Sequence, residues 1–404
     1  MNTTLFRTKL EQACAEDSLL DVRFAYDRKL CLGMGGYGVV YQEPQVGDDR
    51  SVLQKINPIT VRALKKDVSR RILSVDSVKY DRVGKKSYVI FNGQEAYSLG
   101  KKELHNLKVA MAESTHLRLL QGVGYFPKMV EQEWFSEGYS DPVASDREFF
   151  LLDGKLCLRT IREQVPGVNL FDLLGEWFHP LDIVKVAYDL GRALQCMEGA
   201  GIIHRDVKSS NVVYNLRYDE KQNHCPGEGE AYLIDFGGTM RQKKITDLEN
   251  ITYFWDDLTE CVDLFSLEKK DIFGTPGYIA PEVLFGSEAT SYGDRWSLGC
   301  LLYTAIVGDA AFHTNADTRV FTDGRKSELH EKMNETNYFN LDFVEAICSL
   351  FSVNPEERNL NLLLFEAEEI LFCGKGGKLS DIPNMVPLRI LSGLNNVTTL
   401  RPMR

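Results

Sequence analysis

The chain has 404 residues, enough for a sizeable core, and its 44% apolar and 26% charged residues are typical of a folded globular protein. Its formal net charge of −11 argues against nucleic acid as the main partner. The sequence has no run of about 18 apolar residues that would predict a membrane span. Its nine cysteines are scattered and form no Cys-x-x-Cys pair, and no signal peptide is visible. We therefore expect free thiols in a reducing compartment, the cytoplasm.

The first predicted element is a helix over residues 4–21. Its apolar residues recur at helical spacing among charged ones. This helix either packs on the neighbouring domain or binds a partner.

Two short strands are predicted at 30–32 and 39–41, on either side of a Gly-x-Gly-x-x-Gly pattern formed by Gly33, Gly35 and Gly38. Glycine lets the backbone approach a phosphate group without a side chain in the way. A strand on each side distinguishes this loop from a dinucleotide-binding turn, which leads into a helix. A third strand is predicted at 52–56.

A small β insertion is predicted next, because Asn92 and Gly93 separate two β-rich runs and are typical of a hairpin over 88–97. Basic residues accumulate in this insertion: Lys65, Lys66, Arg70, Arg71, Lys85, Lys86, Lys101 and Lys102. They form either a solvated face that keeps an edge strand soluble or a docking patch for an acidic partner.

The next stretches predict a helix over 113–120, ended by Gly122 and Gly124, and an amphipathic helix over 181–199. A hairpin follows at 212–214 and 231–234. The polar loop between its strands, over 217–230, shows no evident chemistry. His224 and Cys225 lack further ligands at metal spacing and predict no metal site.

Four polar residues of two neighbouring loops form a set that suits phosphoryl transfer. They are Asp206, Lys208, Asn211 and Asp235. That reaction needs metal ions held against phosphate oxygens, a carboxylate that orients the attacking hydroxyl, and a cation that offsets developing charge.

Five ordered motifs of this chain resemble those of eukaryotic-type protein kinases, at 33–40, 204–211, 235–237, 274–282 and 294–299. The resemblance covers roughly residues 30–371, and the piece around 113–127 is similar to casein-kinase-1-like members. It implies an α+β, two-lobed kinase fold with a small β-rich lobe and a large, mainly helical lobe.

The expected organisation follows from that resemblance. Residues 1–29 form an N-terminal helical extension, 30–165 the small lobe with an insertion at about 58–108, 166–373 the large lobe with a long activation segment at 235–282, and 374–404 a tail.

The resemblance also implies the roles of individual residues. The expected catalytic residues are Asp206, Lys208, Lys55, Glu113 and Thr275, with Asn211 and Asp235 as ligands of Mg²⁺. The expected ATP-binding residues are Gly33, Gly35, Gly36, Tyr37, Gly38, Val40, Lys55, Glu163, Val165 and Val213. Lys208 and Thr275 favour serine or threonine over tyrosine as the acceptor.

Three positions leave alternatives open. The phosphate-binding lysine is Lys55 or, with better local sequence, Lys65, and Glu113 either pairs with it or lies on the surface. Leu53 stands where the family has alanine. Arg162 stands where the family has an apolar or small residue, so it pairs with Glu113 or Asp235 or turns to solvent, since a buried unpaired guanidinium is costly.

Contacts outside the cleft are also expected. Glu282 should pair with Arg358, and Asp294 should cap the backbone of the loop around Asp206. Thr246, Thr252, Thr259 and Ser266 are candidate phosphate acceptors in an activation segment that is either phosphorylated and paired with Arg205 or constitutively ordered.

The sequence thus favours an active serine/threonine protein kinase that uses ATP and Mg²⁺ and acts on protein substrates. A nucleotide-binding scaffold without catalysis is the first alternative, motivated by Leu53 and Arg162. A small-molecule kinase is the second, and the Pro281–Glu282 segment that serves peptide binding opposes it.

Overall fold

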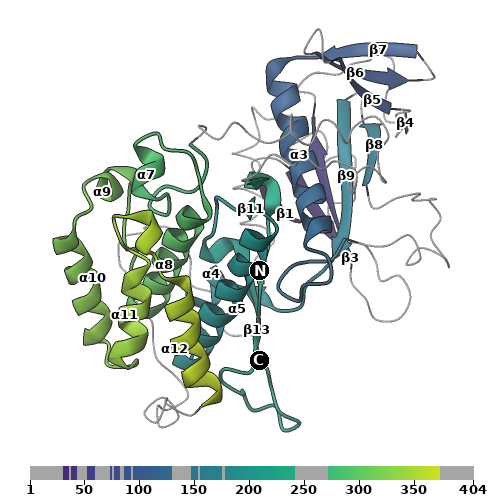
Figure 1. Cartoon of the computed structure of the whole chain (residues 1–404). Helices are drawn as coiled ribbons and strands as arrows, with labels where there is room; N and C mark the ends of the chain where they lie inside the picture. The colour runs from purple at the N-terminus through teal and green to yellow at the C-terminus, as the bar shows by residue number, and fades with distance from the viewer. Residues whose placement is uncertain are drawn as a thin grey trace, which may run out of the picture.

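The computed structural model describes residues 31–35, 38–42, 52–59, 73–74, 77–81, 86–91, 94–129, 147–152, 155–174, 178–241 and 272–373. They form two lobes, one built on an antiparallel sheet and one mainly helical (Figure 1). The predicted α+β, two-lobed architecture is confirmed. The predicted helix at 4–21, residues 242–271 of the activation segment and the tail at 374–404 lie outside the described residues.

The sheet lobe contains six antiparallel strands in the order β1-β2-β3-β9-β8-β4. Their bounds are β1 Cys31–Gly35, β2 Gly38–Gln42, β3 Val52–Pro58, β4 Leu73–Ser74, β8 Arg147–Leu152 and β9 Lys155–Glu163. β9 lies inside the sheet, and only Arg159 and Glu163 escape full burial. Such a nearly unbroken buried run is typical of a strand covered on both faces.

The insertion forms a second, three-stranded sheet, which we call the accessory sheet, from β5 Ser77–Asp81, β6 Lys86–Phe91 and β7 Gln94–Leu99. The hairpin predicted at Asn92 and Gly93 is confirmed, because β6 pairs with β7. The last residues of the expected insertion, at about 58–108, overlap the next helix. Helix α3 (Lys101–Leu119) already begins at Lys101, so Lys101 and Lys102 are its exposed first residues.

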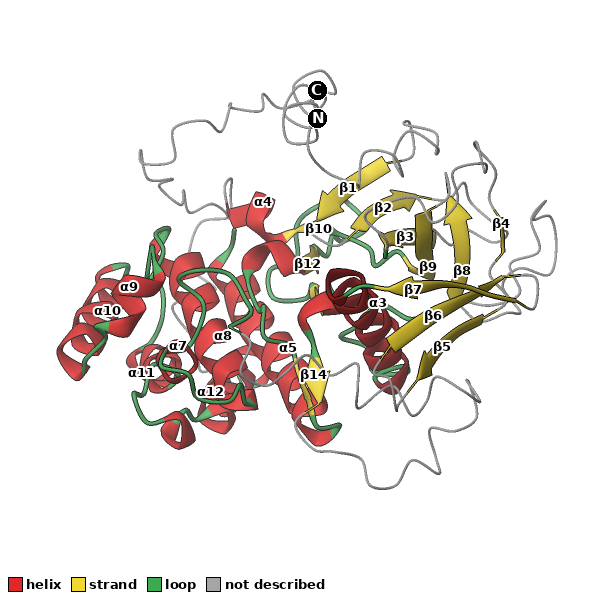
Figure 2. Ribbon diagram, turned by 90° about the horizontal axis from the view of Figure 1, so that it is seen from above, coloured by secondary structure: helices red, strands yellow, loops and turns green. Residues whose placement is uncertain are grey.

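Helix α3 lies between the strands of one lobe and the helices of the other (Figure 2). It carries Glu113, and the helix predicted at 113–120 is its second half. Its first half has the polar, lysine-rich composition of the preceding insertion, which is why the pattern alone did not separate the two.

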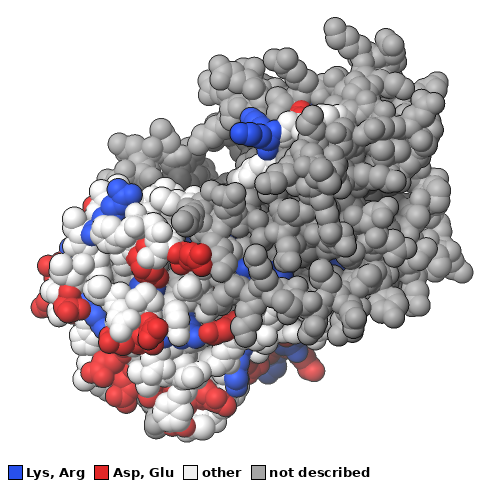
Figure 3. Space-filling model, turned by 45° about the horizontal axis from the view of Figure 1, so that its top comes forward, with Lys and Arg blue, Asp and Glu red and all other residues white. Residues whose placement is uncertain are grey.

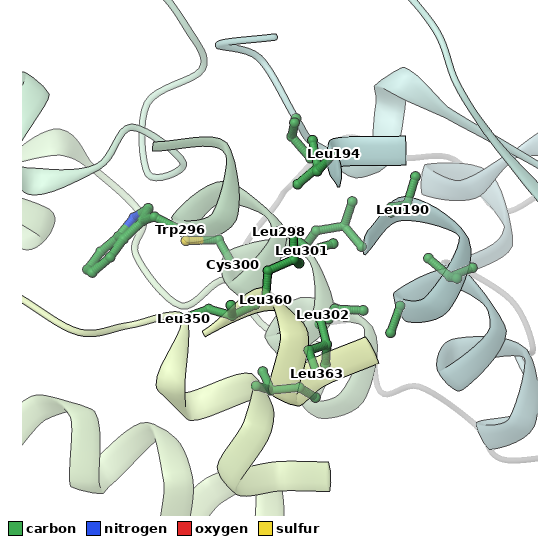
Figure 4. Close-up of a cluster of buried hydrophobic side chains, with 14 of the residues drawn as sticks. Leu190, Leu194, Trp296, Leu298, Cys300, Leu301, Leu302, Leu350, Leu360 and Leu363 are labelled. Carbon is green, nitrogen blue, oxygen red and sulfur yellow. The ribbon is translucent and has the colours of Figure 1, made fainter. Parts of the chain in front are cut away.

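The helical lobe is built around α5 (Pro180–Gly199), α8 (Ser291–Val307) and α12 (Leu360–Phe372). Leucines of these helices gather in a buried cluster, with Trp296 at one side of it (Figure 4). Helix α5 begins with proline after His179, whose Nδ1 accepts a hydrogen bond from the Leu181 N–H at 3.1 Å. The remaining helices are α4 Leu170–Leu174, α7 Pro281–Leu284, α9 Asn315–Arg319, α10 Asp323–Glu335 and α11 Leu341–Ser349, with single 3₁₀ turns at Ser209–Asn211, Phe236–Gly238 and Pro355–Glu357.

Two small sheets fix the loops between the lobes. One has the order β10-β12-β13, formed by Val168–Asn169, Val212–Asn215 and Glu230–Leu233, and contains the predicted hairpin. The other pairs β11 (Ile202–Ile203) with β14 (Met240–Arg241). The loop of Asp206 therefore begins, and the loop of Asp235 ends, on paired strands.

On the visible face of the helical lobe, acidic side chains are more prominent than basic ones (Figure 3). This matches the net charge of −11. Among the described helices, none is both long and apolar enough to cross a membrane.

Candidate active site

The loop of Asp206 is held from below by the buried carboxylate of Asp294 on α8. The backbone N–H groups of His204 and Arg205 donate to its two oxygens, each at 2.7 Å. Burial raises the pKa of Asp294 to about 7 against the opposing effect of these two hydrogen bonds. Arg205 has a φ of 68°, in the left-handed region that residues with a side chain rarely adopt. The expected cap by Asp294 therefore stabilises a strained turn.

Asp206 lies in a compact polar cluster. The Thr275 hydroxyl donates to Asp206 Oδ1 at 2.6 Å, and Lys208 Nζ donates to Thr275 Oγ1 at 2.7 Å. Lys208 Nζ also lies 2.8 Å from Asp206 Oδ2. Asn211 Nδ2 donates to the Asp206 carbonyl at 2.8 Å and to its Oδ2 at 3.0 Å. The four side chains come from two segments that are more than sixty residues apart in the chain.

Asp235 begins the second loop with a φ of 64°, again in the left-handed region. The following Phe236 is fully buried and packs edge-on against His204 and Phe126, with ring centroids 5.1 and 5.7 Å away. This anchoring leaves the Asp235 side chain 47% exposed. The nearby ammonium of Lys55, 3.0 Å away, holds the pKa of Asp235 well below its usual range.

Lys55 on β3 reaches both lobes. Its Nζ donates to Glu113 Oε2 at 2.6 Å as well as to Asp235 Oδ1. Burial lowers the pKa of Lys55, but the charges of Asp235 and Glu113 outweigh burial, and the net direction is upward. Lys55 is thus placed for the expected role, whereas Lys65 lies outside the described residues.

Arg162 on β9 pairs with Glu113, one of the two anions expected for it. Its Nη1 donates to Glu113 Oε1 at 3.0 Å, and both side chains are buried. Leu53 lies directly opposite Arg162 in the register of β3 and β9, so both side chains stand on the face that carries Lys55.

The expected nucleotide-binding residues that the structure describes belong to β1, β2, β3, β9 and β12 and to the segment after β9. Gly33 and Gly35 are in β1 and Gly38 begins β2, whereas Gly36 and Tyr37 lie outside the described residues. Val40 pairs with Lys55 in register and stands on its face of the sheet.

On the connection between the lobes, Glu163 is the last residue of β9, and its N–H donates to the Lys128 carbonyl at 2.8 Å. Val165 and Val213 are partly exposed. Their contacts with adenine stay predictions.

The two expected ligands of Mg²⁺, Asp235 and Asn211, have the oxygen atoms that this ion prefers. Asp235 offers a half-exposed carboxylate, and Asn211 uses its Nδ2 group for hydrogen bonds, which leaves the amide oxygen as an acceptor. The N–H of Ile234 donates to the Asn211 carbonyl at 2.9 Å and joins the two loops. The described part of the chain holds no cluster of three His, Cys, Asp or Glu side chains that would suggest another metal site.

Sequence reasoning missed a second link between α3 and the Asp235 loop. His116 Nδ1 lies 2.6 Å from Thr239 Oγ1, and that hydroxyl donates to the Phe236 carbonyl at 2.7 Å. His116 must therefore be the donor, with its proton on Nδ1. Burial and the charges of Arg241 and Arg205 lower the pKa of His116 to about 3. The available signal was its position three residues after Glu113, which places both on one helix face.

Sequence reasoning also missed the anchoring of the loop at 217–230. The Gly227 N–H and the Tyr214 hydroxyl both donate to Asp182 Oδ1 on α5, at 2.9 and 2.7 Å. A second buried carboxylate, that of Asp189, accepts from the Ala231 N–H at 2.9 Å. This loop therefore holds the hairpin that follows Asn211 against the helical core.

The end of the activation segment is fixed by the expected pair of Glu282 and Arg358. The fully buried guanidinium donates to both carboxylate oxygens at 2.7 Å, to the Tyr292 carbonyl at 2.9 Å and to the Ser352 carbonyl at 3.0 Å. It also lies over the ring of Trp296.

Comparison with known proteins agrees with this geometry. The family model described as the protein kinase domain matches residues 145–366, more than half of the chain. This span includes the loops of Asp206 and Asp235 and the end of the activation segment, and excludes Lys55 and Glu113.

Curated relatives are serine/threonine-protein kinase H2 of Homo sapiens, 28% identical over 47% of this chain and 44% of its own, and serine/threonine-protein kinase PKZ1 of Phytophthora infestans, 28% identical over 43% and 40%. Calcium-dependent protein kinase 5 of Plasmodium berghei is 26% identical over 50% of this chain and 31% of its own. The chain therefore spans less than half the length of these relatives. The finer similarity to casein-kinase-1-like members stays a prediction.

Proposed function

Because this chain belongs to the protein kinase family, we propose that it is an active enzyme that transfers the γ-phosphate of ATP to serine or threonine hydroxyls of proteins. The observation that carries this proposal is the hydrogen-bonded cluster of Asp206, Thr275, Lys208 and Asn211 beside the half-exposed Asp235. This cluster supports the proposal, because phosphoryl transfer requires a carboxylate, a cation and metal ligands close together.

In this proposal the substrate hydroxyl binds next to Asp206, which orients it and accepts its proton. Thr275 and Asn211 hold the carboxylate of Asp206, so little reorganisation is needed. Lys208 offsets charge on the transferred phosphoryl group, and Lys55 binds the α and β phosphates. Asp235 and Asn211 would hold Mg²⁺, which neutralises phosphate charge when it is bound.

The scaffold alternative was motivated by Leu53 and Arg162. The pairing of Arg162 with Glu113 weakens that motive, because the guanidinium neither lies unpaired nor removes Glu113 from Lys55. The small-molecule alternative is opposed by the Glu282–Arg358 pair, which fixes the segment that binds peptides in the family.

The proposal also includes an acidic protein partner and a reducing compartment. Lys101 and Lys102 are exposed at the start of α3, and with the other basic residues of the insertion they support docking of an acidic protein. Six of the cysteines, Cys157, Cys196, Cys225, Cys300, Cys348 and Cys373, are free thiols, which fits a reducing compartment such as the cytoplasm.

The test is transfer of labelled γ-phosphate to a generic basic protein or to the chain itself, followed by identification of the modified residue. We expect phosphoserine or phosphothreonine, and a loss of at least about 100-fold in Asp206→Asn, which corresponds to roughly 2.7 kcal/mol of barrier. Equal transfer by wild type and Asp206→Asn would contradict the assignment. Robust turnover of sugars or aminoglycosides in place of protein would favour the small-molecule alternative.

A further inference from the structure

Glu113 is shared by two buried cations, and only one of them has a role in the proposed reaction. Its Oε2 accepts from Lys55 at 2.6 Å and its Oε1 accepts from Arg162 at 3.0 Å. We propose that Arg162 is a positioning residue that holds Glu113, and with it α3, against the sheet when Lys55 turns to the phosphates of the nucleotide. The reason for this second cation rests on the proposed function, but the contact itself can be tested without it.

The ammonium of Lys55 is not available to Glu113 alone, because it has other partners. This single ammonium already contacts Asp235 at 3.0 Å, and in the reaction it must also bind phosphate oxygens. An ammonium is a compact point charge on a flexible stem, whereas the guanidinium of Arg162 is planar and keeps its charge under all conditions. The arginine can therefore hold the carboxylate while the lysine exchanges partners.

The backbone on both sides of Arg162 keeps it in place. The backbone of Arg162 pairs with Leu53 of β3 in the antiparallel sheet. On its other side it forms an isolated β-bridge with Met129. Its side chain is 8% exposed and that of Glu113 is 3% exposed. Because a buried carboxylate that loses its partners is costly, the two cations can substitute for each other in holding α3.

The charges of the group are balanced. Lys55 and Arg162 contribute two positive charges, and Glu113 and Asp235 contribute two negative charges. If Asp235 holds a metal ion, as proposed, Arg162 would remain paired with Glu113 while Lys55 binds the phosphates. The His116–Thr239 contact holds the same helix three residues further on, but it attaches α3 to the Asp235 loop and not to the sheet.

The decisive experiment removes the lysine and needs no nucleotide. Amide hydrogen exchange of α3 is measured on the full chain in wild type, Lys55→Met, and Lys55→Met combined with Arg162→Met. We expect exchange of α3 in Lys55→Met to match wild type, and exchange in the double variant to rise by at least about 10-fold. Arg159→Met in the Lys55→Met background is the matched control, since Arg159 lies on the same strand but on its other face.

Two outcomes would overturn the proposal. Release of α3 in Lys55→Met alone would show that Arg162 does not hold it, and full protection in the double variant would show that neither cation is needed. Amides of β9 serve as an internal reference for unfolding of the lobe. If they also exchange faster, the comparison is repeated with Glu113→Gln, which removes the buried carboxylate that both cations contact. In that background Arg162→Met should have no further effect on α3, and an undiminished effect would also reject the proposal.

Kinetics provide a second readout. With Lys55 intact, Arg162→Met should lower kcat by about 10–100-fold with a smaller change in KM for ATP, because it disturbs positioning in the transition state. Arg162→Lys should restore part of the loss. A wild-type chain without any phosphoryl transfer would reject the proposed function but leave the exchange result, and so the role of Arg162, standing.

Discussion

Thr275 joins the two charged side chains of the Asp206 loop, since its hydroxyl donates to Asp206 and accepts from Lys208. Thr275→Val keeps the shape but removes both hydrogen bonds, so we expect kcat to fall by about 10–100-fold with KM for ATP nearly unchanged. Thr275→Ser retains the hydroxyl and should keep most of the activity. Steady-state kinetics of the three proteins measure this, and a fall in Thr275→Ser as large as in Thr275→Val would contradict the hydrogen-bonding role.

Asn57 on β3 is a buried residue whose amide nitrogen and oxygen both lack a hydrogen-bond partner among the described residues. A buried amide without partners costs free energy, so Asn57→Leu should leave the free energy of unfolding unchanged or raise it by about 1 kcal/mol. The control is Asn359→Leu, because the Asn359 side chain accepts from the Leu362 N–H at 3.0 Å as the cap of α12. That variant should lose about 1 kcal/mol. Urea unfolding measures both, and a clear loss of stability in Asn57→Leu would show an unrecognised partner.

At the scale of elements, Arg358 ties the end of the activation segment to the helical core. Arg358→Ala leaves Glu282 without its buried partner, so we expect a loss of about 3–5 kcal/mol in the free energy of unfolding. Arg325→Ala provides the contrast, because Arg325 and Glu328 form an exposed pair on α10. Its loss should be below about 0.5 kcal/mol. Similar urea midpoints for the two variants would mean that the buried pair contributes no more than a surface one.

The elements also show what a sequence can and cannot predict. Strands β1, β2 and β3, the β6–β7 hairpin and α5 follow from local patterns, because alternation and capping act between near neighbours. The helix was predicted from residue 113, whereas α3 begins at Lys101, because its first two turns are mainly polar and show no clear apolar pattern. The sequence left Arg162 with Glu113, Asp235 or solvent and could not choose among them, because that choice depends on the distance between α3 and β9 in space. His116 was missed for the same reason.

At the scale of the whole molecule, His116 makes stability depend on pH. Its pKa is about 3 in the folded chain and near 6.5 when unfolded, so the unfolded chain binds the proton first as the pH falls. The stability contributed by the neutral side chain is complete above about pH 6.5 and is lost progressively toward pH 3, at up to about 1.4 kcal/mol per pH unit. Between pH 7 and pH 5, the unfolding free energy of His116→Gln should fall less than that of wild type, by the part that comes from uptake of one proton in the unfolded chain. Urea unfolding at each pH measures this difference. An identical slope in both proteins would contradict it.

Asp294 acts in the opposite direction. Its folded pKa of about 7 lies above the ordinary value of 3.8, so its contribution falls as the pH rises between these values. The pH profile of the intact chain combines both effects, and for that reason the comparison with His116→Gln is more informative than the wild-type profile alone.

The accessory sheet passes into α3 through a single residue, since β7 ends at Leu99 and α3 begins at Lys101. Helix α3 has 19 residues, and Glu113 lies about 18 Å along its axis from that junction. The helix is thus a lever arm with the accessory sheet at one end and the carboxylate that orients Lys55 near the other. Under the proposed function, a torque on that sheet would act through Glu113 on the alignment of the Lys55 ammonium with the phosphates.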